Sequence, residues 1–184
     1  MRLQPVHRAR RFVAVATSPG PGPADRAWAG EWLDDAEGAL FDRLRGADRA
    51  HSIAVARAVA GDPGPDGARA PRWVVSAALL HDVGKADADL GVLGRSVATV
   101  LGWLGGPSVG RWLGARPWRG PVGRACRAVG RYIRYPELGA AALAAGGSDP
   151  RVVAWAREHH RPEADWTVPV AWGRVLRDAD DAAG

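Results

Sequence analysis

Several residue types are scarce in this chain of 184 residues, and asparagine is absent. The single cysteine, Cys126, excludes an internal disulfide and a zinc site built from several cysteines. No apolar run is long enough to span a bilayer. The apolar run at residues 12–16 is also too short for the core of a signal peptide. We therefore expect a cytoplasmic protein without a transmembrane segment.

Lysine is nearly missing: of the 25 basic residues, only Lys85 is a lysine. The net charge is +5, and the isoelectric point is about 10.5. This arginine bias, together with abundant alanine, glycine and proline, is typical of a nucleotide-composition effect, so the positive charge is only weak evidence for nucleic-acid binding. The length and the apolar fraction of 47% suit one globular domain.

Apolar residues recur at helical spacing along most of the chain, and no segment has the alternation of a strand. The sequence predicts an all-α fold, a single domain of about six to eight helices at residues 24–184, after an N-terminal arm at 1–23 that we expect to be partly disordered. One helix is expected over residues 24–45, and another from 93 to a stop at 105–107. Residues 108–120 give no clear pattern.

A buried apolar helix is expected to end in the sequence His81-Asp82-Val83-Gly84-Lys85. This places an imidazole and a carboxylate where the chain leaves the core, and these ligands suit Zn, Mn, Fe or Mg. Histidine is otherwise scarce, which limits the search for partners. The five histidines of the chain are His7, His51, His81, His159 and His160.

The order His51, His81-Asp82 and Asp180 resembles the HD-domain superfamily of metal-dependent phosphohydrolases, over about residues 51–181. The resemblance implies a helical HD-type domain in which these four residues bind one divalent cation (Mn, Zn, Fe, Co or Mg). It also implies hydrolysis of a nucleotide or related phosphoester by an activated water, as a phosphomonoesterase or phosphodiesterase. The family's usual Ala-Asp matches Asp180, whereas helical periodicity alone leaves Asp178 as an alternative. The simpler interpretation is that the two histidines are core residues hydrogen-bonded to aspartate.

The candidate catalytic residues are Asp82, Lys85, His159 and His160. Adjacent helical residues point about 100° apart, so we expect only one of His159 and His160 to reach the site, as a second-metal ligand, a phosphate contact or a general acid. Some HD subgroups have a further metal-binding histidine just before a Pro-x-x-Gly stretch. Here Tyr135 holds that position, which argues against a second metal. Lys85 contacts the substrate phosphate, pairs with a carboxylate on the ligand side, or is a solvated charge at a helix end.

A stripe of arginines is expected on one helix face, at positions 124, 127, 131 and 134. It is a solvated face, or it lines the substrate cleft with Arg131 and Arg134 as phosphate-binding residues, or it docks on RNA or anionic lipid. The alternative function is accordingly a non-catalytic module that binds a nucleotide, RNA or an acidic partner.

Overall fold

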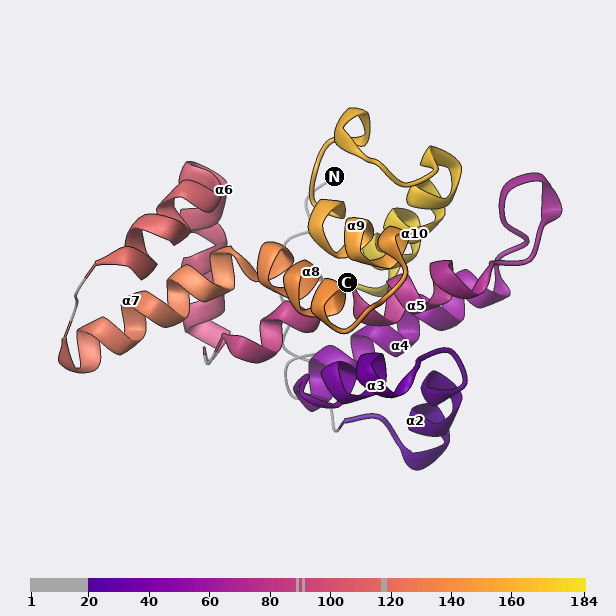
Figure 1. Cartoon of the computed structure of the whole chain (residues 1–184), viewed down its shortest axis with the longest axis horizontal. Helices are drawn as coiled ribbons and strands as arrows, with labels where there is room; N and C mark the ends of the chain where they lie inside the picture. Colours follow the sequence, from indigo (N-terminus) through magenta and orange to yellow (C-terminus); the bar gives the residue numbers. More distant parts are fainter. Residues whose placement is uncertain (1–19, 89, 91, 117–118) are drawn as a thin grey trace, which may run out of the picture.

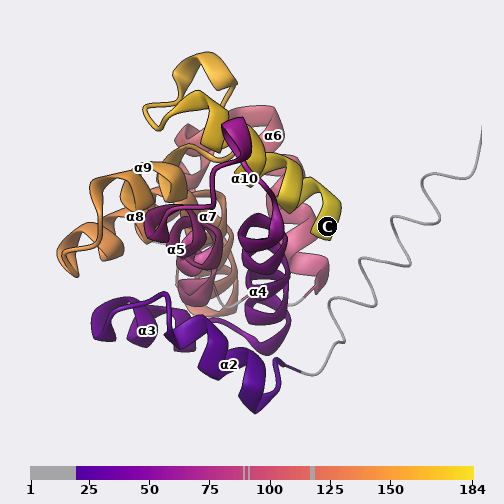
Figure 2. The same cartoon turned by 90° about the vertical axis from the view of Figure 1, so that its right-hand side faces the viewer.

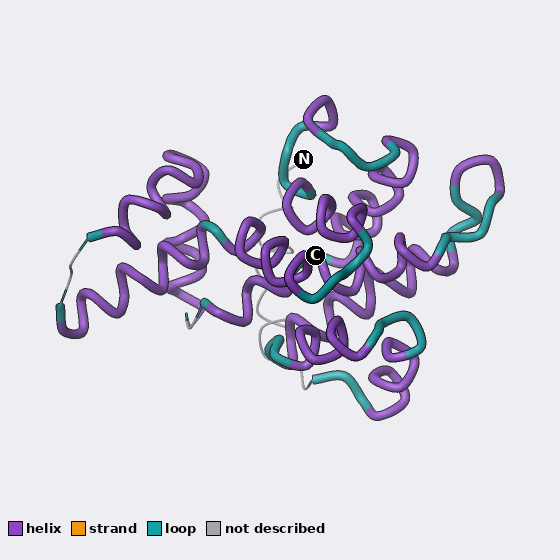
Figure 3. Tube along the Cα trace, viewed as in Figure 1, coloured by secondary structure: helices purple, strands orange, loops and turns teal. Residues whose placement is uncertain are grey.

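The computed structural model describes residues 20–88, 90, 92–116 and 119–184. All regular structure in these ranges is helical (Figures 1 and 3), which confirms the predicted all-α class. Most of the predicted N-terminal arm lies outside the described residues. The α-helices are α2 (Pro23–Gly30), α3 (Asp35–Asp42), α4 (Gly46–Gly61), α5 (Arg72–Leu80), α6 (Val92–Ala115), α7 (Gly120–Ile133), α8 (Tyr135–Ala145), α9 (Pro150–Glu158) and α10 (Val170–Ala183). Short 3-10 helices are η1 (Pro65–Gly67), η2 (Val83–Asp87) and η3 (Glu163–Asp165).

The single helix expected over residues 24–45 is two helices, α2 and α3. The Asp34 side chain accepts a hydrogen bond from the backbone N–H of Glu37, and the Glu37 carboxylate accepts one from the backbone N–H of Asp34. This capping box satisfies backbone donors that a new helix leaves unpaired. The apolar spacing continues across the break, so periodicity alone misses it. Divisions of this kind make the helices more numerous than the sequence predicts.

The helix expected to stop at residues 105–107 is interrupted there, because Gly106 has non-helical φ and ψ angles. Gly106 has φ 58°, a left-handed conformation that glycine adopts without strain, and α6 resumes beyond it to Ala115. The part after Gly106 was unreadable because its many glycines, prolines and arginines hide the helical pattern. Helices α6 and α7 together form a hairpin that extends away from the other helices (Figure 1). The hairpin of α6 and α7 is named the arm below, and it is distinct from the N-terminal arm predicted at residues 1–23.

Helix α5 lies at the centre of the core. Every residue from Trp73 to Leu80 is buried, so this helix is covered on all sides. It packs against α4, α9 and α10, while α2 and α3 lie below α4 and α10 lies above it in the view of Figure 2. Each fully buried leucine, such as Leu79 or Leu80, contributes about 2 kcal/mol. The end of α5 is therefore a rigid point from which the next residues project.

Two glycines hold η2 against the start of α8. A Cβ atom at Gly139 would lie 2.9 Å from the backbone nitrogen of Gly84, so the two backbones touch. The His-Asp-Val-Gly segment and the Pro-x-x-Gly segment are thus in direct contact. In the described part of the chain, no helix has both the length and the apolar character needed to cross a membrane.

Candidate metal centre

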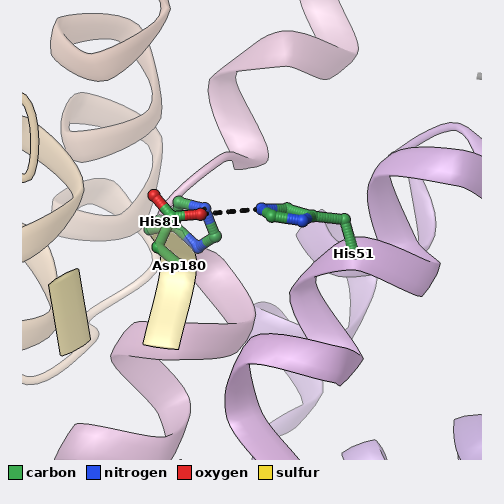
Figure 4. Close-up of side chains that lie close together, drawn as sticks. All are labelled: His51, His81 and Asp180. Atoms are coloured by element: carbon green, nitrogen blue, oxygen red, sulfur yellow. Dashed lines mark hydrogen bonds and ion pairs between the residues drawn. The ribbon is translucent and has the colours of Figure 1, made fainter. Parts of the chain in front are cut away.

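Three predicted ligands, from three different helices, meet at the end of α5. His51 comes from α4, His81 directly follows α5, and Asp180 comes from α10 (Figure 4). One ligand atom of each lies within 4.8 Å of the others. The Asp180 Oδ1 atom is 2.9 Å from His51 Nε2 and 3.8 Å from His81 Nε2. Two imidazoles and a carboxylate in this arrangement are a ligand set for a divalent transition metal.

The protonation of His81 suits a ligand. Its Nδ1 atom lies 2.8 Å from the carbonyl oxygen of Ala78. A carbonyl can only accept, so Nδ1 carries the proton and the lone pair of Nε2 faces Asp82 and Asp180. Such a backbone contact fixes the tautomer and the ring orientation, as is usual for histidines that bind metals. The ring is buried, which limits its motion further.

Asp82 lies beside this trio but is held differently. Its Oδ2 atom is 3.5 Å from His81 Nε2 and forms a close ion pair with Lys85. Its Oδ1 atom is buried and has no hydrogen-bond partner among the described residues. A buried carboxylate oxygen without a partner is costly, and a cation at this position would satisfy it. Asp82 therefore fits a metal ligand, although the tightest group is His51, His81 and Asp180.

The carboxylates of the centre are ionised. Burial opposes the charge on Asp82, but the charge of Lys85 and the hydrogen bond that Lys85 donates help to hold the Asp82 pKa well below its usual value. Burial also opposes the charge on Asp180, and the hydrogen bond from His51 helps to lower its pKa nonetheless. The Lys85 pKa is raised, because the attraction of Asp82 exceeds the effect of burial. Both carboxylates thus carry the charge that a cation requires.

A second group of side chains, Tyr135, His159 and His160, adjoins Asp82. The His159 Nε2 atom lies 3.9 Å from Asp82 Oδ1 and 3.1 Å from the Tyr135 hydroxyl. His159 Nδ1 donates to the carbonyl of Ala156 at 3.1 Å, so its Nε2 accepts the hydroxyl proton. Because Tyr135 has one hydroxyl proton and donates it to His159, the Tyr135 oxygen accepts a hydrogen bond from the Nε2–H of His160.

The pKa shifts of all three groups favour their neutral forms. Burial, together with repulsion by His160 and His81, lowers the His159 pKa well below its usual value. Burial and the charge of Asp82 raise the Tyr135 pKa well above its usual value. His159 thus reaches the centre as a neutral imidazole, and His160 lies farther out and more exposed. The sequence marked Tyr135 only by its place before Pro-x-x-Gly, and not by this contact with both histidines.

The remaining predicted residues lie in different places. Asp178 is exposed and is not part of the group of ligand atoms, whereas Asp180 is. Lys85 is held by Asp82 and lies 5.0 Å above the Tyr135 ring. The structure does not bring Arg131 and Arg134 to the histidines. They line a separate pocket of about 470 Å³ on the arm, with no histidine or aspartate among its described lining residues.

Comparison of the chain with protein-family models, with curated proteins and with solved structures finds no match in any of the three. The functional interpretation therefore depends on the residues and their geometry.

Proposed function

We propose that the chain is a metal-dependent phosphohydrolase that acts on a nucleotide or a related phosphoester. The observation that carries the proposal is the convergence of His51, His81 and Asp180 beside a buried carboxylate oxygen of Asp82 that has no hydrogen-bond partner in the described part of the chain. The order of these residues along the chain supports it, since it resembles that of HD-domain phosphohydrolases. A divalent cation held here would polarise a phosphoryl oxygen and lower the pKa of a water molecule.

The protein's own residues would prepare this centre. The backbone contact at Ala78 keeps the lone pair of His81 Nε2 directed inward. Lys85 neutralises part of the charge of Asp82, so a net positive site remains for an anionic substrate once a cation is bound. The relay of hydrogen bonds from His160 through Tyr135 to His159 leads from the exposed side toward Asp82, and it could deliver a proton to a leaving group.

Hydrolysis of a phosphoester panel tests the proposal. The purified chain is assayed with phosphomonoesters, phosphodiesters and nucleotides, each with added Mn, Zn, Fe, Co or Mg. We expect turnover of at least one substrate. In His81→Ala it should fall more than about 100-fold, because even residues that only support a metal ligand cost 10–100-fold. Asp178→Ala, a nearby exposed carboxylate, is the matched control and should keep its rate. Unchanged turnover in His81→Ala would refute the proposal.

A further inference from the structure

The arm has a charge distribution unlike that of the rest of the chain. The stretch 90–136, which is the arm with two residues before it and three after it, contains eight arginines and neither aspartate nor glutamate. Because the whole chain carries +5, the residues outside this segment carry a net charge of −3. A composition bias of the whole chain would not leave one segment without acidic residues. The arm is therefore a local surface of positive charge.

Four of these arginines surround the one pocket of about 470 Å³ on the arm that was described above. They come from both helices: Arg111 from α6, and Arg127, Arg131 and Arg134 from the α7 side. The other lining residues are three glycines and Ala115. A Cβ atom at Gly130 would lie only 2.8 Å from the carbonyl oxygen of Gly110, so the two backbones touch and no side chain fills the space between the guanidinium groups. The volume is in the range of small-ligand sites, about 300–1,000 Å³.

Existing contacts orient three of these arginines. The Arg131 Nε atom donates to the backbone carbonyl of Asp87 at 2.8 Å. The Arg134 Nε atom donates to Glu137 at 3.1 Å, and Arg111 approaches the same carboxylate at 3.4 Å. Glu137 thus contacts two of the four guanidinium groups, and it is not among the residues that line the pocket. Since each guanidinium has five donors in a rigid fork, oriented groups with remaining donors are suited to phosphate oxygens.

We infer that this four-arginine pocket binds a diphosphate or triphosphate group, as a site distinct from the metal centre. The described lining residues include four guanidinium groups and no carboxylate, which suits the several negative charges of such a group. The group can belong to a soluble compound or to a phosphorylated lipid headgroup. The second source would also use the apolar side chains exposed on the arm, which include Val97, Val100, Leu101 and Trp112. The inference does not depend on the proposed hydrolysis.

The site is tested by calorimetric titration with tripolyphosphate and, separately, with inorganic phosphate, without added metal. Wild type is compared with Arg127→Gln, and the matched control is Arg124→Gln, which removes the same charge from the same helix but does not line the pocket. We expect one equivalent of tripolyphosphate to bind more tightly than phosphate. Binding should weaken about tenfold or more in Arg127→Gln and by less than about twofold in Arg124→Gln.

Two outcomes would overturn the inference. Equal weakening in both arginine variants would mean general attraction to a basic surface. Loss of tripolyphosphate binding in His81→Ala would place the anion at the metal centre instead, whereas retained binding in that variant keeps the two sites separate. Because the titration measures no turnover, an inactive protein that still binds tripolyphosphate leaves this site standing.

Sedimentation with vesicles separates the two sources of the phosphate. Vesicles of phosphatidylcholine that contain a phosphoinositide are compared with vesicles that contain phosphatidylserine at equal charge. Phosphoinositide-selective sedimentation that is competed by tripolyphosphate and lost in Arg127→Gln would identify a lipid headgroup. Tripolyphosphate binding without sedimentation would identify a soluble ligand. Binding to neither probe, or binding only to RNA with a steep salt dependence, would contradict the proposed pocket.

Discussion

The backbone of Gly84 lies directly against that of Tyr135: a Cβ atom at Gly84 would come within 1.9 Å of the Tyr135 carbonyl oxygen. This contact joins the segment that holds His81 and Asp82 to the segment that places the Tyr135 hydroxyl. Any side chain at Gly84 must push η2 and α8 apart. The glycine of the His-Asp-Val-Gly segment is thus required by the approach of two backbones.

Gly84→Ala is expected to destabilise the fold by about 1–3 kcal/mol, the usual cost of overpacking a core. Urea unfolding monitored by circular dichroism measures the change. Gly38→Ala is the matched control: it lies inside α3, and an added Cβ there meets nothing within 4 Å. That variant should be stabilised by about 0.5–1 kcal/mol, since alanine favours helices over glycine. Equal effects of the two substitutions would show that the contact at Gly84 is not tight.

Lys85→Met removes the ion-pair partner of the buried Asp82 and keeps the length of the side chain. We expect a loss of about 3 kcal/mol in the free energy of unfolding near pH 7, because a buried carboxylate loses much of its compensation. Added Mn or Zn should restore part of this stability by binding to the folded state.

The cost of Lys85→Met should depend on pH, with a definite sign. In the wild type the Asp82 pKa lies below its usual value of about 3.9, so its stabilising effect is present above that value and is lost as the pH falls further. In Lys85→Met burial raises the Asp82 pKa, so the variant loses stability as the pH rises through it. Unfolding measured between about pH 4 and 7 should show the difference shrinking toward pH 4. A constant difference would mean that Asp82 does not carry the effect.

Tyr135→His tests why a tyrosine occupies this position. The new imidazole would lie beside His159 and His160 and near Asp82 Oδ1, for which the described residues provide no hydrogen bond. If the resemblance to HD-domain phosphohydrolases holds, the metal content should rise from about one to about two equivalents per chain. Tyr135→Phe keeps the ring without the hydroxyl and should stay at about one. A single equivalent in both variants would show that Tyr135 does not block a second ion.

The sequence predicts the centre better than it predicts the arm. His51, His81 and Asp180 could be selected because histidine is scarce and the spacing resembles a known family, although they lie far apart along the chain. Periodicity could not distinguish Asp178 from Asp180, because the choice depends on how α10 packs against α4. The role of Tyr135 also depends on packing, through the Gly84 contact.

Apolar periodicity alone misses two features of the fold. The break between α2 and α3 comes from a capping box at Asp34 and Glu37, inside a continuous apolar pattern. The second half of α6 follows a bend at Gly106. Periodicity could place Arg131 and Arg134 on one helix face but not say what that face meets, and the structure puts both in the lining of the pocket on the arm.

Metal content tests the central claim most directly. Purified wild type, Asp180→Ala and Asp178→Ala are incubated with Mn, Zn, Fe or Mg salts, dialysed and analysed by elemental mass spectrometry, with circular dichroism as the check on folding. We predict about one equivalent of a divalent metal in wild type and Asp178→Ala, and a loss of more than about tenfold in affinity in Asp180→Ala. Equal metal content in a folded Asp180→Ala, or no metal in any of the three, would contradict the assignment of His51, His81 and Asp180 as a metal centre.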